Sequence, residues 1–159
     1  MKKARPGTDV RASRARNGSR IPTPHPDACT ECGTLMIPSR NAKSLPINGE
    51  RITVRGIPHL RCPKCNNTMT DLEPLQMLFR KAHAIYRERH GLLAGEEIRA
   101  IRTRHRLTQG QLARLLGLGT NTLSRWEAGR NVQTAAMDVL LRLVRDVPGS
   151  LAYLRRHRA

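Results

Sequence analysis

Four cysteines constrain this chain more than any other feature. They are the only cysteines in its 159 residues, and they form two Cys-x-x-Cys pairs, Cys29 with Cys32 and Cys62 with Cys65. Two such pairs supply the four thiolates that tetrahedral Zn²⁺ takes in structural sites. A small segment buries too little apolar surface to be stable without a cross-link or a metal. The spacing therefore predicts one structural zinc ion per chain.

Other uses of the cysteines stay open at this point. Two disulfides or redox-active pairs are alternatives, but the N-terminal stretch lacks the apolar region of a secretory signal, and the cytosol keeps thiols reduced. His25 and His59 lie four and three residues before a cysteine, and either can replace one as a ligand. Four thiolates leave no position for a metal-activated water, which disfavours a catalytic metal.

Strand and helix signals lie between and after the cysteine pairs. Residues 50–61 contain β-branched apolar positions, and Asn48-Gly49 just before them is typical of a hairpin turn. Apolar residues then recur at spacings of three and four over residues 72–90, which predicts an amphipathic helix. We therefore expect a zinc-bound β-hairpin unit with a linking helix over residues 29–91.

The remainder of the chain predicts a run of short helices. Residues 107–129 have the helix, glycine turn and second helix of a helix-turn-helix, with the small Ala113 where the two helices cross. Trp126 falls at an inward position and is expected in the core. The fold class is therefore α+β, with an all-α, lambda repressor-like domain for DNA binding and dimerisation over residues 92–159.

The second helix of this motif carries the candidate base contacts. Asn121 and Arg125 are four residues apart and share one face. In a major groove, Asn reads adenine and Arg reads guanine, although Asn also suits a helix start where it bonds the backbone. Glu127 repels phosphate and is expected to pair with Arg99 or Arg102. Candidate contacts to the DNA backbone or flanking positions are Gln109, Thr120, Ser124 and Arg130.

Charge and composition favour a polyanionic partner. The chain has 29 Lys and Arg against 12 Asp and Glu, a net charge of +17 that attracts nucleic acid. Its 3% of aromatic residues are too few for a stacking platform that binds single strands. Residues 1–28 are expected to form a disordered basic arm, either a solubilising tail or a segment that contacts DNA.

Several function classes are disfavoured. No apolar run approaches the roughly 18–20 residues of a membrane helix. The chain has no H-E-x-x-H motif, phosphate-binding glycine loop or convincing carboxylate cluster, so we do not expect an enzyme such as a nuclease or redox protein. An RNA-binding zinc ribbon is a further alternative.

Two patterns resemble a known family. The pattern LTQ..LA..LG.....LSRWE.G at residues 107–129 is that of the Xre/Cro-type helix-turn-helix. Its combination with two cysteine pairs, V-x-G-I-P at residues 54–58 and a linking helix resembles the MqsA-type zinc-finger antitoxins of type II toxin–antitoxin systems. The resemblance covers roughly residues 29–154.

The resemblance implies a function, partners and a location. Such antitoxins are dimers that bind palindromic operators on double-stranded DNA and repress their own operon, while the zinc domain binds the toxin. It implies Zn²⁺ on the four cysteines and base reading by the Asn and Arg of N-x-x-S-R, in the bacterial cytoplasm and on the nucleoid when DNA-bound. The 28-residue basic extension is not typical of the family, so a stand-alone zinc-containing regulator without a toxin is the alternative. Candidate dimer contacts, any of which can equally be core, are Leu140, Leu141, Val144, Leu151 and Leu154.

Overall fold

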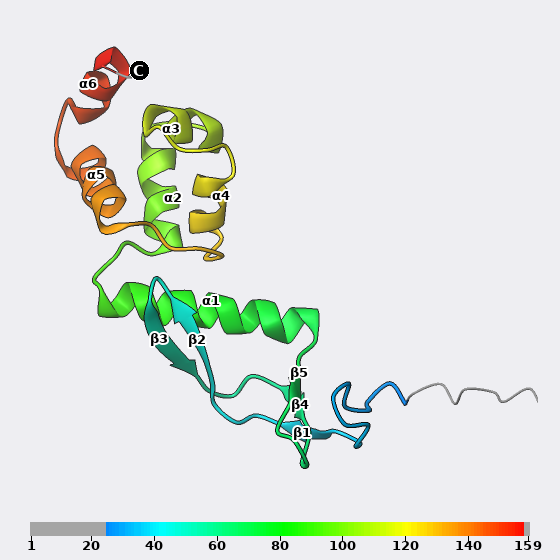
Figure 1. The fold of residues 1–159 in the computed structure, drawn as a ribbon. Coiled ribbons are helices and arrows are strands. Elements are labelled where there is room, and N and C mark those ends of the chain that lie inside the picture. Colours follow the sequence, from blue (N-terminus) through cyan, green and yellow to red (C-terminus); the bar gives the residue numbers. More distant parts are fainter. Residues whose placement is uncertain (1–24, 158–159) are drawn as a thin grey trace, which may run out of the picture.

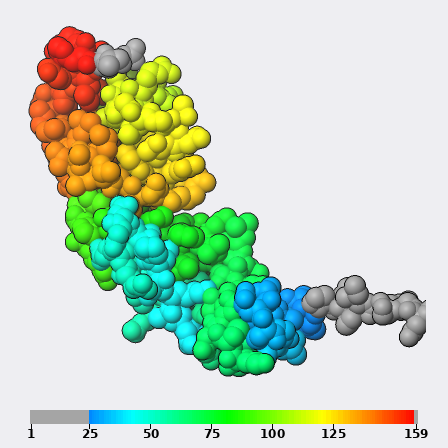
Figure 2. All heavy atoms as spheres, in the orientation of Figure 1, coloured from blue at the N-terminus to red at the C-terminus, as the bar shows by residue number. Residues whose placement is uncertain are grey.

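The computed structural model describes residues 25–157, so the expected basic arm lies outside the described residues except for its last four positions. The molecule is elongated (Figure 2). Short strands occupy one end, a long helix crosses the middle, and five shorter helices form the other end (Figure 1). The two predicted parts, β-containing and all-α, therefore follow one another along the molecule as they do along the chain.

Two small antiparallel sheets form the β-containing end. One is three-stranded with the order β1-β4-β5, and the other is the β2–β3 hairpin, in which Leu45 lies opposite Ile52. Asn48 and Gly49 have φ of 47° and 86°, the left-handed backbone that the hairpin turn requires. The strands are β1 (Ile37–Ser39), β2 (Lys43–Ile47), β3 (Glu50–Val54), β4 (His59–Arg61) and β5 (Thr68–Met69).

Helix α1 (Leu72–Arg89) carries the predicted apolar stripe and packs against the hairpin. Pro74 lies in its first turn, where a missing N–H costs little, and the helix ends before Gly91, whose φ is 60°. Ile52 and Ile57 are fully buried beneath the helix. This layer is called the hairpin–α1 layer below.

The C-terminal part contains helices α2 (Gly95–Arg104), α3 (Gln109–Leu115), α4 (Thr122–Glu127), α5 (Ala135–Asp146) and α6 (Ser150–His157). Thr108 caps α3 together with Gln111, and Thr134 caps α5 by accepting a hydrogen bond from the Met137 amide. Trp126 is buried as expected. The common core contains Leu93, Ile98, Ile101, Leu107, Leu112, Ala113, Leu116, Leu123, Trp126, Leu141 and Val144.

Two details refine the expectations for this part. Thr120 and Asn121 precede α4 instead of opening it, because the Thr122 amide donates to the Gly119 carbonyl 3.0 Å away in a turn. Among the candidate dimer contacts, Leu141 and Val144 are buried in the core of a single copy. No described helix combines the length and apolar character needed to cross a membrane.

Candidate metal centre and nucleic-acid interface

The four cysteine sulfurs converge on one point. Their Sγ atoms all lie within 4.8 Å of one another. Cys29 is 3.5 Å from Cys65, and Cys32 is 3.5 Å from Cys62. A tetrahedral metal with bonds of about 2.3 Å to sulfur needs sulfurs about 3.8 Å apart. The cluster therefore fits one metal ion, and the separations exceed a disulfide bond of about 2.05 Å.

Two tight turns bring each cysteine pair together. The Gly33 amide donates to the Cys29 carbonyl at 2.8 Å, and the Asn66 amide donates to the Cys62 carbonyl at 3.0 Å. Gly33 and Asn66 have φ of 70° and 62°, the left-handed conformation that Gly and Asn adopt most readily. The residue after each second cysteine therefore closes its turn, as its identity predicts.

Hydrogen bonds and burial shift the pKa values of two of the thiols in opposite directions. The hydroxyl and the backbone amide of Thr34 lower the pKa of the Cys32 thiol to about 6. The Asn67 amide acts to lower the pKa of Cys65, but desolvation and the neighbouring thiols outweigh it and raise that pKa to about 12. Four thiolates at these distances repel one another unless a metal ion compensates them.

Both candidate histidines lie outside this cluster. The metal-competent group consists of the four cysteines alone among residues 25–157. The Nδ1 of His59 donates to the Ile57 carbonyl at 2.9 Å, and the Nδ1 of His25 accepts from the Asp27 amide at 3.1 Å. The four-thiolate set is therefore the arrangement that the described chain presents to a metal.

The predicted helix-turn-helix, formed by α3, the turn after it and α4, has the two candidate base-reading residues on its surface. Asn121 and Arg125 are both exposed, and the Arg125 amide donates to the Asn121 carbonyl at 3.2 Å, so they occupy consecutive turns. Behind them, Leu123 and Trp126 are buried in the core and fix the helix against α3. An amide and a guanidinium thus face outward from a well-packed helix.

The remaining candidate DNA contacts differ in their surroundings. Thr120 and Arg130 are exposed. The Ser124 hydroxyl donates to the Asn121 carbonyl at 3.0 Å. The side-chain amide of Gln109 donates to the Glu127 carboxylate at 2.8 Å, so one of its two N–H groups is already used within the protein.

Glu127 forms the ion pair expected for it, with Arg102. Both nitrogens of the Arg102 fork reach the carboxylate, at 2.6 and 2.9 Å, and the Glu127 side chain is 5% exposed. Burial acts to raise the pKa of Glu127, but the hydrogen bonds from Arg102 and Gln109 outweigh it and lower that pKa. This pair fixes the end of α4 to α2 and leaves the outward face to Asn121 and Arg125.

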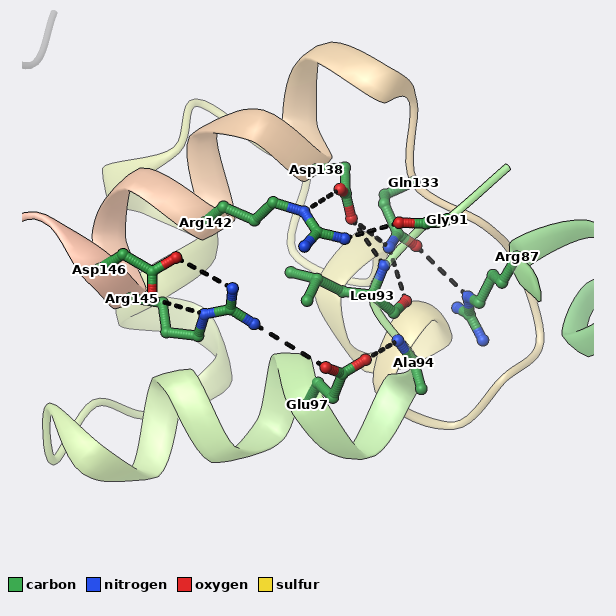
Figure 3. Close-up of polar contacts among 10 residues, drawn as sticks. All are labelled: Arg87, Gly91, Leu93, Ala94, Glu97, Gln133, Asp138, Arg142, Arg145 and Asp146. Atoms are coloured by element: carbon green, nitrogen blue, oxygen red, sulfur yellow. Dashed lines mark hydrogen bonds and ion pairs between the residues drawn. The ribbon is translucent and has the colours of Figure 1, made fainter. Parts of the chain in front are cut away.

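A group of buried polar side chains was missed by sequence reasoning. Arg87, Gln133 and Asp138 are all buried, and hydrogen bonds connect them between α1, the 131–134 segment and α5. No local sequence pattern predicts these hydrogen bonds, because Arg87 and Gln133 are 46 residues apart in the chain. Figure 3 shows the network around the α1–α2 connection.

Comparison with known proteins gives two matches. The family model described as the antitoxin component of the bacterial toxin–antitoxin system, MqsA, matches residues 22–155. Antitoxin HigA-2 of Vibrio cholerae serotype O1 (strain ATCC 39315 / El Tor Inaba N16961) is 36% identical over 62 residues, which are 39% of this chain. The chain spans 60% of the length of this curated relative.

Proposed function

Because the chain belongs to the MqsA family of toxin–antitoxin antitoxins, we propose that it is a dimeric transcriptional repressor whose helix-turn-helix reads an operator upstream of its own gene. The observation that carries the proposal is the exposure of Asn121 and Arg125 on consecutive turns at α4. Arg reads guanine O6 and N7, and Asn reads adenine N6 and N7. Both residues therefore have the chemistry and the access to specify bases.

The surroundings of α4 supply contacts to the DNA backbone. Thr120 and Arg130 lie exposed just before and after the helix, and Arg114 is exposed on α3. Such residues neutralise or hydrogen-bond phosphates and fix the register of a helix in the major groove. Gln109 is the weaker candidate, because its amide is bound to Glu127.

A second copy of the chain is the proposed occupant of the outer face of α5. Val139 and Leu143 on α5 and Val147 just after it are spaced by four residues and are 57%, 44% and 46% exposed, so residues 25–157 of one copy do not cover this apolar stripe. A two-fold dimer joins identical patches and presents two recognition helices to half-sites about 34 Å apart, or a multiple of that distance. Leu143→Glu should then yield monomers in native mass spectrometry, whereas Tyr153→Glu, which changes an exposed apolar residue on α6, should not.

The metal of the four-cysteine cluster is proposed to be structural Zn²⁺, one per chain. Cys29, Cys32, Cys62 and Cys65 would hold it, and we propose that this unit also binds the toxin. When bound, the ion neutralises the thiolates and links the two turns. Four protein ligands leave no coordination position for a reacting water, so this centre stabilises a fold and supplies no catalysis.

Arg125→Ala tests base reading directly. We expect this variant to lose about 1–3 kcal/mol of binding free energy on DNA from upstream of the gene, and much less on a scrambled duplex. Arg156→Ala, which removes the same charge from exposed α6, is the matched control. Fluorescence anisotropy with both duplexes measures the difference, and equal losses of Arg125→Ala on both would refute base reading.

The 28-residue basic extension favours a second candidate, a stand-alone regulator without a toxin. Co-expression with the product of the neighbouring open reading frame decides between the two. A stable complex that depends on residues 25–69 supports the antitoxin function. Absence of any complex, together with retained operator binding, supports the stand-alone regulator.

A further inference from the structure

The guanidinium of Arg87 is buried at the end of the recognition helix. Arg87 lies on α1 and is 6% exposed, yet it donates to carbonyl oxygens far along the chain, those of Trp126 at 3.0 Å and Asn131 at 2.6 Å. Its Nε also donates to Gln133 at 3.4 Å. A buried cation is costly unless its donors are satisfied, and here Nε and one terminal nitrogen of Arg87 donate to three neutral acceptors. One side chain of α1 therefore binds the last turn of α4 and the segment after it.

Other contacts hold the same end of α4 in place. The Nδ1 of His83, one turn before Arg87, donates to the Gly129 carbonyl at 3.1 Å. Gly95 approaches so closely that a Cβ there would lie 2.5 Å from the Glu127 carbonyl oxygen and 2.8 Å from that of Trp126. Val132 is buried in the hairpin–α1 core. The end of the recognition helix thus lies between α1 and the start of α2.

Side chains of α5 and of the segment before it also form hydrogen bonds with the backbone of the connection between α1 and α2 (Figure 3). Arg142 donates to the Gly91 carbonyl at 2.6 Å. The Leu93 amide donates to Asp138 at 2.8 Å, and the Leu93 carbonyl accepts from Gln133 at 2.7 Å. A backbone segment with this many buried partners is not a free hinge.

We propose that Arg87 is a positioning residue for operator recognition, which joins the hairpin–α1 layer and the helix-turn-helix into one body and fixes the orientation of α4. This inference rests on the proposed function. It places the division of the molecule between the four-cysteine unit and the hairpin–α1 layer, not at the α1–α2 connection. The cysteine unit has a separate small core of Cys29, Met36 and Cys62, which none of the Arg87 contacts reach.

The substitution Arg87→Lys tests the proposal without a change of net charge. Lysine keeps the cation but loses the planar fork that reaches several acceptors at once. We expect hydrogen exchange of residues 126–133 to accelerate and the operator Kd to rise about tenfold, as for loss of hydrogen bonds from a charged donor. Binding to scrambled DNA and the metal content should not change. Arg89→Lys is the matched control, since Arg89 lies two residues away on the surface and pairs with Glu50.

The outcomes separate the proposal from the proposed function. Binding is measured well below the unfolding midpoints, so that a merely structural role leaves the operator Kd unchanged and overturns the proposal. Equal exchange of residues 126–133 in Arg87→Lys and Arg89→Lys also overturns it. If the wild-type chain does not prefer upstream DNA over scrambled DNA, the repressor function fails, and the exchange data still judge the Arg87 contact.

If Arg87→Lys does not fold, wild-type exchange decides. Residues 126–133 must then be protected to the same degree as the end of α1, and independent, faster exchange would contradict a single body.

Discussion

The four-cysteine unit and the helix-turn-helix are stabilised in opposite ways. The first, formed by residues 25–39 and 59–69, has a buried core of only Cys29, Met36 and Cys62. The second belongs to the helical unit of residues 93–157, which has eleven buried apolar residues in one continuous cluster. Apolar burial of that extent stabilises a small helical domain without help, whereas three residues do not. One short chain therefore combines a unit that the proposed metal would stabilise with a unit that depends on its core.

The hairpin–α1 layer between them belongs with the second unit in this respect. It has its own apolar core, which includes Val132 from the segment after α4. The comparison thus predicts that substitutions at the metal centre leave the hairpin–α1 layer folded. Substitutions in the helical core should in turn leave the metal bound. Four changes test this division, in order of decreasing effect.

Loss of one ligand should have the largest effect. Cys62 is fully buried, and in Cys62→Ser the metal site loses a thiolate. Structural Zn²⁺ contributes an apparent free energy on the order of 10 kcal/mol to small domains, so we expect the cysteine unit to unfold and the metal to be lost. Native mass spectrometry counts the metal, and hydrogen exchange follows residues 25–39 and 59–69.

Operator binding should survive that change, because residues 95–157 keep their own core. Lys64→Ser is the control, since Lys64 is exposed between the ligands of the second pair. Loss of both the metal and operator binding in Cys62→Ser would contradict the division into two units.

The sequence predicts each unit where its determinants are local. A few neighbouring residues determine each of three features: the Cys-x-x-Cys turns, the Asn48-Gly49 turn and the helix cap at Thr108. The structure contains all three. The contacts of Arg87 with Trp126 and Gln133, and of Gln133 with Leu93, join positions 39 to 46 residues apart, and no periodicity encodes them. The side-chain direction of Gln109, toward Glu127, likewise depends on tertiary packing.

A cavity in the helical core should have the next largest effect. Leu123 is fully buried behind the recognition face. Leu123→Ala should lower the free energy of unfolding by about 2–5 kcal/mol. Trp126 is the only tryptophan of the chain, so its fluorescence during urea unfolding reports this unit. The metal content should stay at one per chain, and its loss would show that the two units are not independent.

A side chain added at Gly95, where α2 approaches the end of α4, should destabilise the helical unit less than the cavity of Leu123→Ala does. A Cβ at Gly95 would lie 2.5 Å from the Glu127 carbonyl oxygen, and backbone cannot move aside easily. We expect Gly95→Ala to cost about 1–3 kcal/mol in the same fluorescence assay. A Cβ at Gly110 in α3 would meet no atom within 4 Å, so Gly110→Ala should be neutral or stabilising by up to about 1 kcal/mol. Equal effects of the two substitutions would argue against a close approach at Gly95.

Acid should lower the free energy of unfolding of the helical unit, because it protonates Glu127. The pKa of Glu127 is lowered from its ordinary value of 4.5, because the Arg102 and Gln109 hydrogen bonds outweigh the opposing effect of burial. The unfolded chain therefore binds the proton more tightly than the folded chain. The stability that this pair contributes is fully present above pH 4.5 and is lost as the pH falls through the lower folded pKa. Acid also reprotonates the thiolates and releases the metal, so Trp126 fluorescence is used to follow the helical unit alone.

Glu127→Gln should remove this acid-dependent component while it lowers the stability at neutral pH, since Arg102 then loses its charged partner. Glu31→Gln is the control, because Glu31 is exposed in the four-cysteine unit, outside the region that Trp126 reports. A stability profile in Glu127→Gln that falls below pH 4.5 as steeply as in the wild type would assign the acid sensitivity to other carboxylates, such as Asp138, whose pKa is also lowered. In that case the ion pair at the end of α4 would not be the cause of the acid sensitivity of the helical unit.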